Sequence, residues 1–95
     1  MREIAMDGGS WEVSSDVYDA FFKAVGAPAW HGRNFNALRD SIAKGRINDV
    51  EIPYLIRIKN YTSISVDAKH MAADFVDLIR ELHESGVPVD VQVDD

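Results

Sequence analysis

The chain has 95 residues, of which 46% are hydrophobic, so we expect a single domain spanning residues 1–95 with one core. Its formal net charge of −6 argues against direct nucleic-acid binding, which requires a basic surface. The lack of cysteine excludes disulfides and thiol chemistry. No signal peptide or segment of membrane-spanning length is evident, so we expect a cytoplasmic protein that makes no membrane contact.

The N-terminal residues predict a short strand. Residues 3–6 are partly apolar, and the turn-forming residues 7–9 end the expected strand. Trp11 and Val13 alternate with polar residues, so they either extend the sheet or cover its end.

A first helix is predicted after this strand. We expect Ser14 or Ser15 to cap it, because a serine hydroxyl can accept a hydrogen bond from an amide of the first turn. Asp16 follows in the first turn, where the helix dipole favours a negative charge, and Gly26 and Pro28 end the helix. Apolar residues spaced three and four apart define its buried face, which is expected to contain Tyr18, Phe21, Phe22 and Val25.

The stretch from Pro28 to Gly45 predicts a turn followed by a short helix. Asn34 is a suitable N-cap residue, and Gly45 is a suitable residue to end the helix. Its apolar stripe is expected to contain Phe35, Leu38 and Ile42. The opposite face contains Asn36, Asp40, Ala43 and Lys44. Trp30, in the turn, is either a core plug or an interface anchor.

The second half of the chain predicts a strand, a long helix and a final strand. Residues 54–59 are rich in β-formers and are apolar on both faces at their start, which is typical of an interior strand flanked by helices. Residues 61–65 predict a polar connector that has room for a helical turn. Residues 87–93 alternate as a strand with one buried face. Gly86 ends the long helix, whose apolar positions are expected to be Val66, Ala68, Met71, Ala72, Phe75, Leu78, Ile79 and Leu82. Helices between strands predict an α/β fold, a three-stranded parallel sheet with helices packed on it.

Neither a metal site nor a catalytic site is predicted. Asp67, His70 and Asp74 share one helix, but a fourth ligand is missing, so we expect a solvated face and no metal. His83 lies near the end of the same helix, where a cation complements the dipole. His31 lacks a nucleophile beside it, because Ser41 lies next to the apolar stripe and looks buried. We therefore expect no enzyme activity and no cofactor.

One motif resembles a known family signature. It is Pro28-x-Trp30-x-Gly32-x-Asn34-Phe35-Asn36-Ala37-Leu38-Arg39-Asp40, and it is similar to the signature of the barstar family of intracellular ribonuclease inhibitors. The resemblance covers nearly the whole chain, since the order of elements agrees. Pro53 before the central strand and the Arg80-Glu81 pair five residues before Gly86 agree as well.

The resemblance implies that the second helix and the turn before it block a ribonuclease active site. Asp40 would take the place of a substrate phosphate, Trp30 would be the contacting aromatic, and Glu81 an outlying acidic contact. The implied partner is a secreted guanyl-type ribonuclease or a related toxin domain, bound by a protein that is monomeric when free. The implied partner-binding residues are Trp30, His31, Gly32, Asn34, Asn36, Arg39, Asp40, Ala43, Lys44 and Glu81.

The sequence departs from the family pattern within this motif. Asn36 stands where the family has an aspartate, and Arg39 replaces an aromatic residue. Ala43 and Lys44 replace smaller or hydroxylated contacts. Residues 30–46 carry a net charge of +3, which leaves −9 for the rest of the chain. The alternative is therefore a barstar-like binding module for a different toxin or a regulatory protein.

Overall fold

The computed structural model describes residues 2–27, 34–43 and 50–95, with the side chain of Phe35 excepted. The predicted order of strand, helix, helix, strand, helix and strand is confirmed. The short helical turn predicted between the second strand and the last helix is present as well. In chain order the elements are β1 (Arg2–Asp7), η1 (Gly8–Ser10), α1 (Ser14–Val25), α2 (Phe35–Ala43), β2 (Tyr54–Lys59), η2 (Tyr61–Ser63), α3 (Val66–Glu84) and β3 (Val89–Val93).

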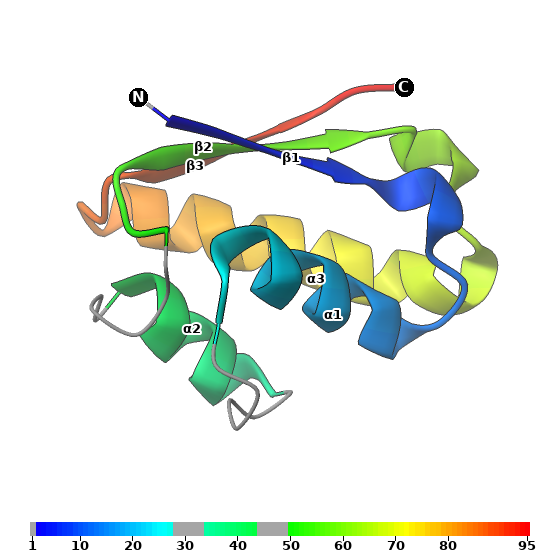
Figure 1. The fold of residues 1–95 in the computed structure, drawn as a ribbon, viewed down its shortest axis with the longest axis horizontal. Coiled ribbons are helices and arrows are strands. Elements are labelled where there is room, and N and C mark those ends of the chain that lie inside the picture. The colour runs from blue at the N-terminus through cyan, green and yellow to red at the C-terminus, as the bar shows by residue number, and fades with distance from the viewer. Residues whose placement is uncertain (1, 28–33, 44–49) are drawn as a thin grey trace.

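The strands form a three-stranded parallel sheet in the order β1-β2-β3, as the sequence predicts. Ile56 in the central strand pairs with Ile4 on one side and Val91 on the other. The described helices lie together on one face of this sheet (Figure 1). The expectation that helices flank β2 therefore holds for one face only, and Leu55 and Arg57 on the other face are half-buried.

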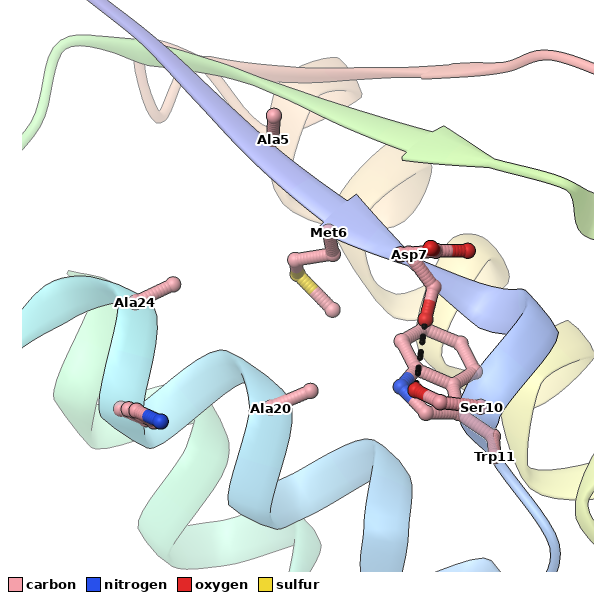
Figure 2. Close-up of a pocket in the computed structure, with 8 residues that line it drawn as sticks. Ala5, Met6, Asp7, Ser10, Trp11, Ala20 and Ala24 are labelled. Carbon is pink, nitrogen blue, oxygen red and sulfur yellow. Dashed lines mark hydrogen bonds between the residues drawn. The ribbon is translucent and has the colours of Figure 1, made fainter.

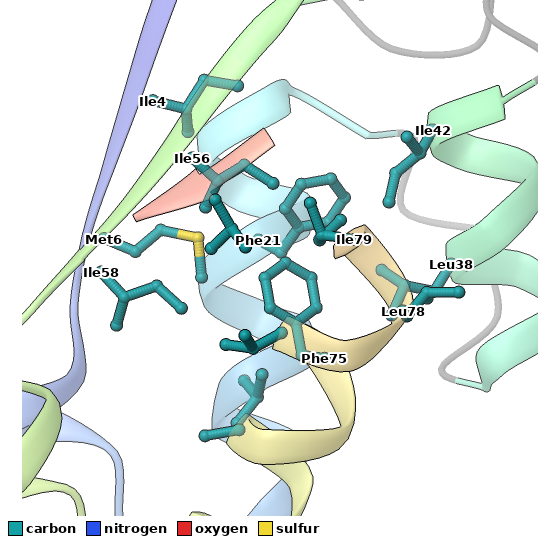
Figure 3. Packing of buried hydrophobic residues seen from close by; sticks show 14 of the residues in the cluster. Ile4, Met6, Phe21, Leu38, Ile42, Ile56, Ile58, Phe75, Leu78 and Ile79 are labelled. Atoms are coloured by element: carbon teal, nitrogen blue, oxygen red, sulfur yellow. The ribbon is translucent and has the colours of Figure 1, made fainter. Parts of the chain in front are cut away.

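The core fills the space between the sheet and the helices. The ring centroids of Phe21 in α1 and Phe75 in α3 lie 5.3 Å apart, and those of Phe21 and Tyr54 lie 6.5 Å apart. Figure 3 shows these two phenylalanines between the isoleucines of the strands and the apolar side chains of α2. One continuous apolar cluster thus holds the helices against the sheet.

The N-terminus of α1 differs from the prediction that a serine caps it. Val13 occupies the N-cap position, and its side chain makes no capping bond. The Asp16 carboxylate instead accepts hydrogen bonds from the backbone amides of Glu12 at 2.7 Å and Val13 at 3.0 Å. These bonds lower the pKa of Asp16. At the other end, Gly26 adopts the left-handed conformation, with φ of 69°, and ends α1 as predicted.

Other positions differ from the predicted apolar pattern. Val17 in α1 is fully buried although it was not on the predicted face, and Tyr18, which was, is half-buried. Val66 begins α3 but is 83% exposed, because it lies on the opposite side of the helix from the buried residues. Val76 is buried although it was not on the predicted stripe, since α3 is covered by both the sheet and α1. Trp11 does not extend the sheet: it follows η1 and is buried in the core cluster.

The last strand is shorter than predicted. β3 begins at Val89, not at residue 87, and Val93 on its predicted buried face is partly exposed. Within the described ranges, no helix combines the length and the apolar character needed to cross a membrane.

Candidate partner-binding surface

The first turn of α2 is fixed by Asn34. Its side-chain Oδ1 accepts a hydrogen bond from the backbone amide of Ala37 at 2.8 Å, and its carbonyl accepts one from the amide of Leu38 at 2.9 Å. This geometry confirms the predicted N-cap. Because the cap fixes where the helix begins, it also fixes which α2 residues face the core and which face outward.

Two aliphatic side chains anchor α2 to the rest of the molecule. Leu38 and Ile42 are fully buried, and Figure 3 shows them pointing from α2 toward Leu78 and Ile79 of α3. Ser41 is buried beside them, as predicted. This part of the predicted stripe is confirmed.

The opposite side of α2 is polar and accessible. Asn36, Arg39 and Ala43 are exposed, and Asp40 is half-buried. The spacing of these residues follows from the helical period once Leu38 and Ile42 are buried. The structure thus places four of the predicted partner-binding residues on one side of one helix.

An ion pair connects this side of α2 to α3. Arg39 Nη1 lies 3.4 Å from Glu81 Oε1, although the two residues are 42 positions apart in the sequence. Glu81 therefore lies beside this side of α2. We call the set Asn36, Arg39, Asp40, Ala43 and Glu81 the α2–α3 surface.

The pairing of Arg39 with Glu81 was not predicted from the sequence. Each residue was singled out by itself, one for its unusual charge and the other for its position near the end of α3. No periodic signal connects two helices so far apart in the chain, so only the packing of α2 on α3 brings them together. Of the other predicted binding residues, Asn34 is exposed and caps α2. The rest lie outside the described residues: Trp30, His31, Gly32 and Lys44.

Two histidines of α3 that the sequence singled out, His70 and His83, contact other groups of the protein. His70 Nε2 lies 3.5 Å from Asp74 Oδ2 on the exposed side of α3. Across the described ranges, three or more metal-ligating side chains nowhere gather at one point. The ring Nδ1 of His83 lies 2.8 Å from the carbonyl oxygen of Val89, so a protonated Nδ1 donates to it and ties the end of α3 to β3.

A groove of about 390 Å³ lies elsewhere, between β1, η1 and α1 (Figure 2). Its walls are mostly small or apolar side chains, with Asp7 and Lys23 as charged members. Ser10 Oγ donates a hydrogen bond to the carbonyl oxygen of Asp7 at 3.3 Å across one end. None of the residues that line this groove belongs to the α2–α3 surface, so the two features are separate.

A family comparison covers almost the entire chain. The family model described as Barstar (barnase inhibitor) matches residues 1–94. A search of curated proteins returned no match. The matched region includes β1 to β3 and therefore both helices of the α2–α3 surface.

Proposed function

Because the chain belongs to the barstar family, we propose that it inhibits a secreted guanyl-type ribonuclease by covering the active site with α2 and residues 28–33. The family match over residues 1–94 carries this proposal. The geometry of α2 supports it, since a capped and anchored helix offers a polar side without a large rearrangement. In this function the protein needs no cofactor and performs no chemistry.

Asp40 is proposed as the residue that replaces a substrate phosphate. A ribonuclease active site is rich in cationic groups, and a carboxylate enclosed by them accepts short, charge-assisted hydrogen bonds. Asp40 lies on the outward side of α2, between Arg39 and the buried Ser41 in sequence. Burying α2 in the enzyme would therefore bring the Asp40 carboxylate to the cations that normally hold RNA.

The charge of the whole molecule favours the encounter. The formal net charge of −6 attracts a basic ribonuclease over a distance of about 8 Å at physiological salt. Such attraction raises the association rate, and the contacts made by Asp40 then slow dissociation. We propose that the protein acts in the cytoplasm as a monomer, protecting the producing cell before the enzyme is secreted.

An RNA-cleavage assay with barnase tests this function. We expect the protein to inhibit cleavage at a stoichiometric ratio, and we expect Asp40→Asn to weaken inhibition by about 100-fold, or about 2.7 kcal/mol. Asp67→Asn is the matched control, since it removes the same charge in the first turn of α3, and its inhibition should equal that of the wild type. Unchanged inhibition by Asp40→Asn would show that this carboxylate is not the phosphate mimic.

A second candidate function is favoured by one observation, the ion pair between Arg39 and Glu81. This pair, together with the neutral Asn36, reduces the negative charge of the α2–α3 surface, so the surface attracts a strongly basic enzyme less by its local charge. The alternative is a barstar-like module that binds another toxin domain or a regulatory protein. Affinity capture followed by an RNA-cleavage assay of the captured partner separates the two, because only a ribonuclease partner loses activity on binding.

A further inference from the structure

The ion pair between Arg39 and Glu81 is a weak one. Its Nη1–Oε1 distance of 3.4 Å exceeds the 2.7–2.9 Å that is typical of a charge-assisted hydrogen bond. The two side chains are 45% and 62% exposed, so water screens their attraction. A binding partner can therefore recruit the Arg39 guanidinium without breaking a strong contact.

The α2–α3 surface presents charges of both signs. Arg39 supplies one positive charge, Asp40 and Glu81 supply two negative charges, and Asn36 and Ala43 supply none. A partner with only basic groups would be attracted to Asp40 and repelled by Arg39. A complementary partner therefore needs a negative group opposite Arg39 beside the positive groups that surround Asp40.

The shape of the guanidinium favours a carboxylate as that negative group. An arginine side chain carries five N–H donors in a planar fork, which matches the two oxygens of an aspartate or glutamate. The contact with Glu81 engages Nη1. Glu81 also keeps the guanidinium between α2 and α3, which reduces the freedom that Arg39 loses when a partner binds.

We propose that Arg39 is a specificity-determining residue that selects a ribonuclease with an aspartate or glutamate beside its basic active site. Glu81 is the positioning residue that holds Arg39 in place for this contact. The proposal rests on the proposed ribonuclease-inhibitor function and deepens it, because it names the chemistry of the partner's surface.

A display library of catalytically inactive barnase tests the proposal. Each surface position around the active site is changed in turn to Glu, Gln or Lys, and the library is selected against the wild-type protein, Arg39→Glu and Glu81→Asp. At one or more positions we expect the wild type to enrich Glu over Lys by about tenfold or more. Arg39→Glu should reverse that preference at the same positions.

Two further measurements separate the roles of the residues. Lys69→Gln is the control for loss of a positive charge: it lies twelve residues before Glu81 on α3, which is roughly 18 Å along the helix axis. It should retain the wild-type preference. Glu81→Asp keeps the negative charge but shortens the side chain that contacts Arg39, so it should reduce the Glu-over-Lys ratio without reversing it. A merely structural role of Glu81 would lower all binding equally and leave the ratio unchanged.

Two other outcomes would contradict either the role of Arg39 or the inhibitor function itself. If wild type and Arg39→Glu enrich the same barnase variants, the selection of a carboxylate by Arg39 is wrong, while the inhibitor function stands. If the folded wild type binds neither barnase nor any variant in the library, the proposed function itself is contradicted. Circular dichroism of each variant verifies that it is folded before selection.

Discussion

Two arginines on two surfaces of this protein make different kinds of contact. Arg57, on the face of the sheet that the described helices leave open, lies 3.2 Å from Glu3 and 3.3 Å from Asp94. Its Nη2 also donates to Gln92 at 3.4 Å. The network connects β2 to β1 and β3, and the Arg57 side chain is 32% exposed. Arg39 on the α2–α3 surface, by contrast, pairs with Glu81 and is 45% exposed.

The difference separates a structural charge from one that can take part in binding. The acids around Arg57 are carried by or directly follow strands whose register is fixed by backbone pairing, so the guanidinium has two carboxylates in defined places. Its contact with Asp94 is electrostatic, because the geometry at Nε does not form a hydrogen bond. Arg39 connects two helices through one long contact, and its pairing costs little to rearrange. We therefore expect the sheet network to affect stability and the helix pair to affect binding.

The largest effect on stability is expected for a side chain buried beneath the α2–α3 surface. Leu38→Ala should lower the free energy of unfolding by about 2–5 kcal/mol, because it removes a fully buried side chain and leaves a cavity between α2 and α3. Urea unfolding followed by circular dichroism measures this change. Val66→Ala is the control, since it removes aliphatic atoms from an exposed position and should change stability by less than about 0.5 kcal/mol. A cost below about 1 kcal/mol for Leu38→Ala would show that α2 does not depend on this anchor.

The buried faces of α2 and α3 show how much of the fold could be predicted from the sequence. The helical period gave α2 its buried Leu38 and Ile42, and it gave α3 most of its buried face. The predicted stripe was wrongly extended to Val66, which lies on the opposite side of the helix from the buried residues and is exposed. The N-cap of α1 was assigned to a serine, whereas the Asp16 carboxylate accepts hydrogen bonds from the amides of Glu12 and Val13. Several residue types can satisfy the same amides, so local sequence does not decide among them.

Only part of the α2–α3 surface could be predicted, because local sequence patterns do not show which elements pack together. Asp40 could be assigned to the outward side of α2 because its place depends on one helix and one cap. The contact between Arg39 and Glu81 depends on the packing of α2 on α3, and no local pattern in the chain encodes it. The open face of the sheet, with Arg57 at its centre, was missed because the central strand begins with apolar residues on both faces.

A smaller effect on stability is expected when the two arginines are replaced. Arg57→Met should lower the free energy of unfolding by about 1 kcal/mol, because two carboxylates lose the cation between them. Arg39→Met should change it by less than about 0.5 kcal/mol, since its exposed single pair is screened by water. Urea unfolding at 0.1 M and 1 M NaCl compares the two, and the Arg57 effect should shrink at high salt.

The stabilities of these two variants can also contradict the distinction between a structural Arg57 and an Arg39 that is available for binding. Methionine keeps most of the aliphatic bulk of arginine, so the change isolates the charge from the packing of the side chain. If Arg39→Met is as destabilising as Arg57→Met, both arginines are structural. In that case the pair with Glu81 is not available to a partner.

The smallest expected effect concerns a carboxylate at the end of the sheet. Asp7 accepts hydrogen bonds from Asn60 Nδ2 at 2.8 Å and from the Gly9 amide at 2.9 Å. The bond from Asn60 and then the bond from Gly9 lower the pKa of Asp7 below its ordinary 3.8. A lowered pKa in the folded protein stabilises the fold above pH 3.8, and this contribution is lost as the pH falls through the folded-state pKa.

Asp7→Asn should therefore be slightly less stable than the wild type at pH 7, and the two should converge as the pH falls below 3.8. Urea midpoints at pH 7, 5, 4 and 3 measure this difference, and Asp95→Asn, at an exposed position outside the helices, controls for the loss of one negative charge. Inhibition of barnase at pH 7 should be the same for Asp7→Asn as for the wild type, because Asp7 lies at the sheet and not on the α2–α3 surface. A difference that grows toward low pH would contradict the role of the Asp7 carboxylate, since a protonated carboxyl no longer accepts these bonds as an anion.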